Sequence, residues 1–415
     1  MTKRLILLMV LMASAANAQF TLQGVRNFDM THQSTQGKSV AISTNGNTVV
    51  VGGPQGSAGL WAWTRSASVW SQQAGPLSPG TASSGYSVTI SGDGNTAAVG
   101  APNDTPGQTG SVQVYTRSGS VWSVQGFKLV ANDKVGTIGS QGWSLAMSND
   151  GNTLLVGAYQ DGNTGALFGA AYIWVRNAGS WTEQAKLVGS DHSGSFGGLG
   201  QSVALSADGN TALVGAYADN AWVGAAWVWT RSGTTWNQQG FKLVGTGATG
   251  TPAYQGSSVA LSPDGNTAAI GGYNNNSGQG GVWMWTRAAG VWTQRQLVIG
   301  SSGTTASQGW SVALSNLGST LIVGGPGDTV NGTVGWGSIW VFIRSGNTWT
   351  QQGSKISTTN WGGGAEASGT SVAITSDGLT AVSGAPNSNN GVGAFYVFTA
   401  PPPVVPNTRR VILVN

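Results

Sequence analysis

The chain has 415 residues, of which 40% are hydrophobic and only 8% are charged, with a formal net charge of +4 and no cysteine. The hydrophobic content argues against disorder, the lack of cysteine excludes disulfides and lipid-modified cysteines, and the weak charge makes nucleic acid a poor partner. The 67 glycines favour many short strands joined by tight turns.

The N-terminus has the three parts of a secretory signal peptide. Lys3 and Arg4 precede the apolar run 5–12, and Ala16-Asn17-Ala18 is a small-residue cleavage site. We therefore expect residues 1–18 to be removed, which leaves a net charge of about +2. No later segment approaches the roughly 20 apolar residues of a membrane helix. The sequence predicts a secreted protein without membrane insertion, outside the cell or in the periplasm of a Gram-negative one.

From residue 36 onward one pattern recurs seven times, with substitutions at single positions: a Gly-x-Ser-Val start, an Asp-Gly-Asn-Thr turn and a Val-Gly-Ala finish. The serines of the start lie 48 to 60 residues apart, at Ser39, Ser87, Ser144, Ser202, Ser258, Ser311 and Ser371. The repeats begin near residues 36, 84, 141, 199, 255, 308 and 368. A repeat that covers the whole mature chain indicates one domain, and seven similar units favour a closed ring.

The fourth repeat predicts four strands. Residues 202–206 and 211–216 form two strands joined by the tight turn at Asp208-Gly209. A variable loop leads to a third alternating strand at 225–231, and a second turn leads to an outermost strand at 236–243. Four antiparallel strands form one propeller blade, and the lack of helical periodicity excludes a solenoid of strands and helices.

The ends of the chain predict how the ring closes. The last repeat stops after its third strand, 394–399, and runs into Pro401-Pro402-Pro403. Residues 20–26 resemble the outermost strand at 236–242. We therefore predict an all-β, seven-bladed β-propeller over residues 19–399, in which the N-terminal strand completes the last blade. Residues 400–415 are a Pro-rich tail, or an accessory strand through 410–414.

Most of the 19 tryptophans recur at fixed places in the repeat, which indicates packing rather than binding. Pairs such as Trp227 and Trp229 share one face of the third strand and fill the wedge between blades. The tryptophan that opens the fourth strand, such as Trp236, lies within reach of Arg231, which predicts cation–π stacking at the rim. The arginines are spread around the ring, so they form no polyanion-binding patch.

Other aromatic and acidic residues fall in loops that meet on one face of a propeller. The candidate ligand-binding residues are Trp222, Trp336, Trp361, Tyr159, Tyr217, Tyr273, Asp161, Asp219, Asp328 and His192. Such a surface suits recognition of a carbohydrate or a protein. The alternative is that these loop side chains fold over the central channel.

Residues capable of catalysis are scarce. The two histidines, His32 and His192, lie in connectors between blades, and Glu183 and Glu366 belong to distant repeats. Five aspartates occupy the tight turns, where Asp-Gly has a conformational role. No metal-ligand spacing, phosphate-binding loop or nucleophile elbow is present in the sequence. We therefore expect neither catalysis nor a cofactor.

The repeats resemble FG-GAP repeats, the blades of the integrin α-chain propeller and of many exported bacterial proteins. The resemblance covers about residues 20–399 and rests on Gly-x-Ser-Val, on Val-Gly-Ala-Pro at 99–102 and on Tyr-Val-Phe-Thr at 396–399. It implies an extracellular adhesion or ligand-binding role. The Phe that names the family is replaced by Gln36, Ser84, Gln141, Leu199, Gln255, Gln308 and Ser368. Calcium-binding members use an Asp-rich loop that is only a short turn here, so we expect no structural calcium.

The sequence as a whole predicts a secreted, monomeric, non-catalytic adhesion or binding module that recognises an extracellular protein or glycan through its loop face. One alternative is a lectin that stacks sugars on Trp222, Trp336 and Trp361. Another is a polysaccharide hydrolase or lyase, which requires His192 and the loop aspartates to converge in one pocket. The third is a structural surface protein that assembles through its low-charge exterior.

Overall fold

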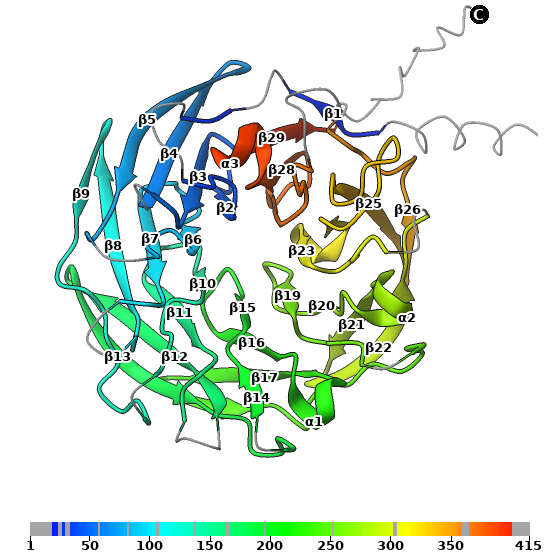
Figure 1. The fold of residues 1–415 in the computed structure, drawn as a ribbon. Helices are drawn as coiled ribbons and strands as arrows, with labels where there is room; N and C mark the ends of the chain where they lie inside the picture. The colour runs from blue at the N-terminus through cyan, green and yellow to red at the C-terminus, as the bar shows by residue number, and fades with distance from the viewer. Residues whose placement is uncertain are drawn as a thin grey trace, which may run out of the picture.

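The computed structural model shows a closed ring of seven sheets (Figure 1). It describes residues 19–400 except 24–26, 30–33, 57–58, 81–82, 105–107, 137, 163–166, 195, 251, 302–304 and 359–364. The predicted signal peptide and the tail from residue 401 lie outside the described residues. Among the described helices none has the length and apolar character needed to cross a membrane.

Each blade has four antiparallel strands, which we call A to D from the central channel outwards. Blades 1 to 3 contain β2 (Ser39–Ile42), β3 (Thr48–Gly53), β4 (Gly59–Ser66), β5 (Val69–Leu77); β6 (Ser87–Ile90), β7 (Thr96–Ala101), β8 (Ser111–Ser118), β9 (Val121–Val124); β10 (Ser144–Met147), β11 (Thr153–Ala158), β12 (Leu167–Asn177), β13 (Ser180–Leu187). In blade 3, β14 (Phe196–Leu199) also pairs with β12 in parallel.

The remaining blades follow the same order. Blades 4 to 7 contain β15 (Ser202–Leu205), β16 (Thr211–Ala216), β17 (Ala225–Ser232), β18 (Thr235–Gln238); β19 (Ser258–Leu261), β20 (Thr267–Gly271), β21 (Val282–Ala288), β22 (Val291–Val298); β23 (Ser311–Leu314), β24 (Thr320–Gly325), β25 (Ser338–Ser345), β26 (Thr348–Gln351); β27 (Ser371–Ile374), β28 (Thr380–Ala385), β29 (Ala394–Thr399) and β1 (Thr21–Leu22). Short helical turns are α1 (Asp219–Trp222), α2 (Asn275–Gly278), η1 (Asn316–Gly318) and α3 (Ser388–Gly391).

The N-terminal strand closes the ring, as predicted. Strand β1 pairs with β29 and places Leu22 opposite Phe398, so the last blade gains its fourth strand from the start of the chain. The side chain of Gln23 then accepts hydrogen bonds from Arg65 and Trp70 of the first blade, both at 3.2 Å. The first and last blades are therefore joined by main-chain and side-chain contacts, and no sheet edge is left open at the seam.

The repeated Gly-x-Ser start joins neighbouring blades. Six of the seven serine hydroxyls donate to the carbonyl of the repeated glycine in the next blade, at 2.6 to 2.9 Å. Ser87 bonds to Gly142 in this way, and Ser371 bonds to Gly37 across the seam. The motif recurs because every blade needs the same donor and the same acceptor at the interface with its neighbour.

The recurring aromatic residues form the core and the rim. Trp61, Trp227, Trp283 and Trp340 on the C strands are at most 1% exposed and fill the spaces between blades. At the rim, six Arg–Trp pairs place the guanidinium carbon 4.8 to 5.5 Å from the ring centroid. These aromatics have the packing roles expected of them, so they are removed from the set available for binding.

Glutamine at the family's Phe position also has a structural role. The side chain of Gln255 accepts the N–H of Gly245 at 2.6 Å and donates to its carbonyl at 3.0 Å, and Gln308 does the same with Gly300. Both side chains are 1% exposed. A buried amide thus holds the connector that leads from strand D to the next strand A, and hydrogen bonding replaces aromatic packing.

Candidate functional site

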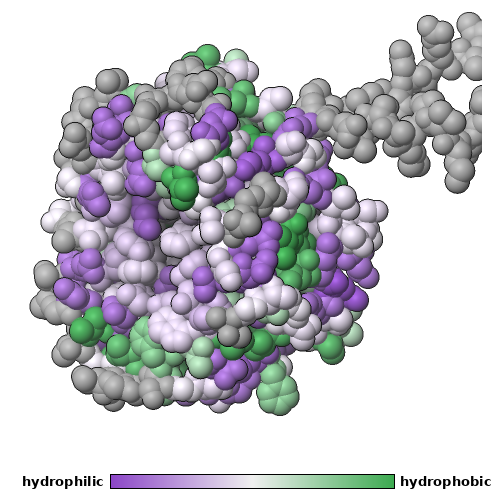
Figure 2. Space-filling view, turned by 45° about the vertical axis from the view of Figure 1, so that its right-hand side comes forward, coloured by the Kyte–Doolittle hydropathy of each residue, from purple (hydrophilic) through white to green (hydrophobic). Residues whose placement is uncertain are grey.

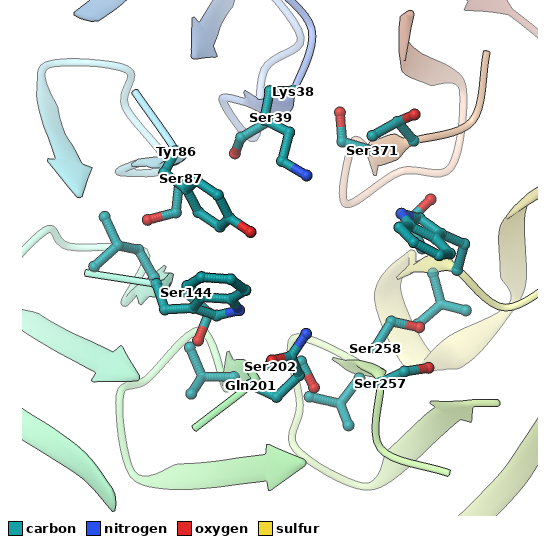
Figure 3. A pocket seen from close by; sticks show the side chains of 18 of the residues that line it. Lys38, Ser39, Tyr86, Ser87, Ser144, Gln201, Ser202, Ser257, Ser258 and Ser371 are labelled. Atoms are coloured by element: carbon teal, nitrogen blue, oxygen red, sulfur yellow. The ribbon is translucent and has the colours of Figure 1, made fainter. Parts of the chain in front are cut away.

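A cavity of about 630 Å³ lies in the central channel where the A strands begin (Figure 3). Residues from all seven blades line it. The loops between strands B and C reach this end as well, because Gly224 and Gly280 of these loops form parallel bridges with Gln255 and Gln308 just before the A strands. We call this end of the channel the channel mouth. Its size is within the usual range for a ligand pocket.

The residue before each repeated serine differs from blade to blade and lines this cavity. In chain order these seven residues are Lys38, Tyr86, Trp143, Gln201, Ser257, Trp310 and Thr370. The serine beside six of them donates to the next blade, and Ser39 accepts the N–H of Val88 in the next blade, so the residue before each serine can vary without loss of the contact between blades. The repeat therefore presents six kinds of side chain at seven fixed places around the mouth, with tryptophan at two of them.

Aromatic rings surround most of the channel mouth. We call the following set the aromatic arc: Tyr86, Trp143, Tyr159, Tyr217, Trp222, Tyr254, Tyr273 and Trp310. All of them except Trp222 and Tyr254 line the cavity directly. The arc begins on blade 2 and ends on blade 6, so a ligand in the mouth meets aromatic surface on several sides.

The rings of the aromatic arc contact one another in two runs. In the first run, Trp143 lies between Tyr86 and Tyr159, with centroids 4.3 and 4.2 Å away. The second run includes Tyr273 and Trp310, whose centroids are 4.7 Å apart in a tilted geometry. Such contacts hold the rings in place, so that little side-chain entropy is lost when a ligand binds.

The second run continues from Tyr273 back to blade 4. Tyr254 lies 5.3 Å from Tyr273, and Trp222 lies 5.7 Å from Tyr254 and 5.4 Å from Tyr217. Trp222 and Trp310 remain 41% and 39% exposed. Each has tyrosine neighbours on one side and solvent on the other, which is the arrangement of a stacking surface.

Four tyrosines of the aromatic arc, Tyr86, Tyr159, Tyr217 and Tyr273, stay protonated. Burial raises the pKa of Tyr86, and the nearby Tyr159 and Tyr217 raise it further. The pKa values of Tyr159, Tyr217 and Tyr273 are raised in the same way, first by burial and then by tyrosine neighbours. Their hydroxyls are therefore neutral groups that can both donate and accept hydrogen bonds.

Lys38 is the single charged residue that lines the cavity in the described part of the chain. Its ammonium group points into the channel and lies 5.0 Å from the centroid of Tyr86 (Figure 3). Burial lowers the pKa of Lys38, and the described residues provide its ammonium with no carboxylate partner. The mouth thus combines one desolvated positive charge with aromatic surface.

The opposite end of the channel holds a smaller cavity, with Thr44 and Asn149 among its polar lining residues. This cavity of about 160 Å³ is lined by Ile42, Ile90, Met147, Leu205, Leu261 and Leu314 together with residues of the turns between strands A and B. Main-chain hydrogen bonds of 2.9 to 3.0 Å connect these turns from blade to blade: Thr44 to Gly92, Gly92 to Asn149, Asn149 to Ala207 and Ala207 to Pro263. Binding groups are therefore concentrated at the mouth.

The structure separates the predicted aromatic candidates into three groups. Tyr159, Tyr217 and Tyr273 lie together in the channel mouth. Trp222 contacts Tyr217 and Tyr254 of the aromatic arc. Trp336 is half-buried and donates its indole N–H to the carbonyl of Thr358. Trp361 lies outside the described residues.

The predicted acidic surface is absent, because the three candidate aspartates are buried. Asp161, Asp219 and Asp328 are at most 4% exposed. Each forms an ion pair with a lysine from strand D, or the segment after it, in its own blade, at 2.6 to 3.2 Å. The partners are Lys186, Lys242 and Lys355. Carboxylates neutralised in this way hold the loop between strands B and C and are not presented to a ligand.

His192 does not join the aspartates. It is exposed and packs against Phe168 with ring centroids 4.0 Å apart, outside the channel mouth. His32 lies outside the described residues. The convergence required for a hydrolase or lyase is therefore not observed for His192 and the three aspartates. Within the described ranges no three His, Asp or Glu side chains gather closely enough to hold a metal ion.

The sequence analysis missed four members of the aromatic arc: Tyr86, Trp143, Tyr254 and Trp310. Three of them occupy the variable place in Gly-x-Ser-Val, which was interpreted only as the start of a strand. The available signal was the variation itself, because one position held six kinds of residue in seven repeats while the glycine and serine beside it stayed constant. Tyr254 precedes the buried Gln255 and carried no comparable signal.

Comparison with known families supports the repeat assignment. A family model described as the FG-GAP repeat matches residues 181–229, which run from strand D of blade 3 through strands A, B and most of C of blade 4. A comparison with curated protein sequences finds no significant match. The fold and the channel mouth are therefore the features that indicate function.

Proposed function

Since the chain is a seven-bladed propeller of FG-GAP repeats that resembles the N-terminal propeller of integrin α chains, we propose that it is a secreted, non-catalytic binding module. Its partner is an extracellular protein or glycan that docks on the loop face and inserts a group into the channel mouth. The observation that carries this proposal is the aromatic arc around a cavity of about 630 Å³.

A binding role fits the residues of the mouth better than a catalytic one. General acid–base chemistry requires a titratable group poised near the working pH, and hydrolysis of a glycoside requires two facing carboxylates. The mouth instead offers tyrosines whose pKa values are raised, one lysine, and several hydroxyls. These groups can stack and hydrogen-bond, which are the requirements of recognition.

The surrounding face supports a partner larger than the cavity. Green hydrophobic residues are scattered among white and purple ones over the face seen in Figure 2. A partner therefore finds mixed polar and apolar contacts around the mouth, as in non-obligate interfaces. We propose Trp222 as a contact at the edge of this surface and Trp336 as a further contact; Trp361, a candidate from the sequence, lies outside the described residues.

The experiment that tests this proposal measures binding of the mature protein, from Gln19 onward, to a broad glycan array and to a panel of extracellular matrix proteins. Trp310→Ala and Tyr273→Ala each remove part of the aromatic arc. Phe241→Ala is the matched control, because Phe241 is an aromatic residue that is 84% exposed and does not line the mouth.

We expect saturable binding that both mouth variants weaken at least tenfold and that the control leaves unchanged. Equal binding by all three variants would contradict a site at the channel mouth. Turnover of any glycan on the array would contradict the non-catalytic assignment.

A further inference from the structure

Resting on the proposed function, we infer that the channel mouth binds a glycan residue that carries a carboxylate group, with Lys38 as the contact for that carboxylate and the aromatic arc as the stacking surface for the sugar ring. Three features of the mouth lead to this ligand class. They are the ammonium group of Lys38, the hydroxyl groups of the repeated serines, and the rings of the aromatic arc.

The charge in the mouth requires an anionic partner. A half-buried ammonium group without a carboxylate partner among the described residues is costly, and a bound anion compensates for that cost. The four ion-paired lysines of the blades show the contrast: Lys128, Lys186, Lys242 and Lys355 each contact a buried aspartate of their own blade. Lys38 has the Tyr86 ring instead, so its charge is left available to a ligand.

The wall of the mouth accepts hydrogen bonds. The hydroxyl hydrogens of Ser87, Ser144, Ser202, Ser258, Ser311 and Ser371 are committed to glycine carbonyls of the next blade. These six serines line the cavity, and each hydroxyl oxygen keeps lone pairs that can accept a further hydrogen bond. A ligand that matches them must bring many O–H donors around its edge. A sugar does so, whereas a peptide brings as many carbonyl acceptors as N–H donors.

The aromatic arc provides the surface for the ring. The faces of aromatic side chains carry partial negative charge and attract the partly positive C–H groups of an apolar surface. A pyranose presents C–H groups on its faces and hydroxyls around its edge, so it can stack on Trp310 or Trp143 while its edge meets the serine oxygens. Gln201, whose amide nitrogen points into the channel, is available as a further donor to the carboxylate or a ring oxygen (Figure 3).

The test uses uronic acid tetrasaccharides as probes: galacturonate, mannuronate and glucuronate, each compared with the same chain after its carboxyl groups have been reduced to alcohols. Titration calorimetry measures binding to the mature protein. Lys38→Met removes the charge and Lys38→Arg keeps it. Lys134→Met is the matched control, because Lys134 is also half-buried but does not line the mouth.

We expect at least one uronate chain to bind at least tenfold more tightly than its reduced form, and Lys38→Met to abolish that preference. Lys38→Arg retains the preference, and the Lys134 variant behaves as wild type. Equal binding of acidic and reduced chains, or an unchanged preference in Lys38→Met, would overturn the acidic-ligand inference. In that case loss of binding in Trp310→Ala would still support the proposed function. Absence of binding by every tetrasaccharide would also overturn the inference, and the matrix protein panel then decides the proposed function separately.

Discussion

The two ends of the central channel are made by the same seven strands, yet they differ in what the repeat allows. At the turn end every blade contributes a tight turn, and main-chain hydrogen bonds connect neighbouring turns around a cavity of about 160 Å³. At the mouth the blades contribute six kinds of residue at one position of the repeat, around a cavity of about 630 Å³. Residues that are the same in every blade therefore build the ring, and the binding groups lie at the position that varies between blades.

The interface between blades tolerates substitution least, and Gly100→Ala is the variant that tests this most strongly. A Cβ atom on Gly100 would lie 2.0 Å from the carbonyl oxygen of Gly142 in the next blade. We expect Gly100→Ala to lower the free energy of unfolding by at least about 3 kcal/mol, since Gly100 lies in the buried strand β7 and Gly142 is held in place by its own hydrogen bond to Gly157. Denaturant unfolding followed by tryptophan fluorescence measures the change.

Gly119→Ala is the control for this variant. Gly119 lies in a turn between strands C and D with φ of +62°, and a Cβ atom there would have no neighbour within 4 Å. Alanine in that conformation costs about 1 to 2 kcal/mol. A loss in Gly100→Ala no larger than in Gly119→Ala would show that contact between blades does not explain the repeated glycine.

The buried ion pairs provide the next largest effect. Asp219 accepts hydrogen bonds from Lys242 and from the backbone N–H of Ser193, both at 2.6 Å. Asp219→Ala leaves the lysine charge largely buried and unpaired, so we expect a loss of about 3 kcal/mol. Thermal and denaturant unfolding give the value.

Blade 5 indicates how that loss can be recovered. It has Asn275 and Leu297 at the places of the aspartate and the lysine, and Asn275 still accepts the N–H of Thr249 at 3.0 Å. We expect the double variant Asp219→Asn, Lys242→Leu to be more stable than Asp219→Ala. A double variant as unstable as Asp219→Ala would mean that the charge pair itself is required.

The fold could be predicted because each repeat encodes it separately. Gly-x-Ser-Val, the Asp-Gly turn and the aromatic pair on strand C each report one local requirement, and seven copies make the pattern clear. Even the closure by Thr21–Leu22 followed from the missing last strand at Thr399. Local patterns and the global fold agree at these positions.

The site was harder to predict because burial depends on residues that are distant in sequence. Asp219 seemed to be a surface carboxylate, since its partner Lys242 lies on the outermost strand and only the folded blade brings them together. Trp310 was not predicted as a binding residue, since its exposure depends on the channel that the assembled ring encloses. Periodicity identifies the residues of the core, whereas a binding site consists of exceptions to it.

The serine that joins blades should have a moderate effect. Ser311 donates to the carbonyl of Gly369 at 2.8 Å. We expect Ser311→Ala to lower the free energy of unfolding by about 1 kcal/mol, because a partly buried carbonyl loses its partner. Ser118→Ala, at an exposed strand end, should change it by less than about 0.5 kcal/mol. A loss in Ser311→Ala no larger than in Ser118→Ala would show that the serine contributes little to the interface.

The turn end should also respond to acid. Partial burial raises the pKa of Asp93, but hydrogen bonds from Ser91 and Asn95 outweigh this effect and hold the pKa below its usual 3.8. The pKa values of Asp150 and Asp208 are lowered in the same way, by hydrogen bonds from the corresponding residues of their own turns. A carboxyl whose pKa is lower in the folded state stabilises the fold above pH 3.8, and that contribution is lost as the pH falls further. Thermal unfolding between pH 7 and pH 2.5 should show the decline. Solvent screens these turns, so we expect the effect of each to be small, and Asp93→Asn should reduce the slope slightly.

The smallest effect on stability is expected for Trp310→Ala at the channel mouth, in contrast to Trp283→Ala between the blades. Trp283 is fully buried between blades, so Trp283→Ala should cost about 3 to 5 kcal/mol. Trp310 has its main ring contact with Tyr273 and remains 39% exposed, so Trp310→Ala should cost less than about 1 kcal/mol while it weakens ligand binding. Unfolding and binding measured on the same samples separate the two roles. If Trp310→Ala unfolded the protein as readily as Trp283→Ala, the variable position would be part of the architecture, and the distinction between the two ends of the channel would no longer hold.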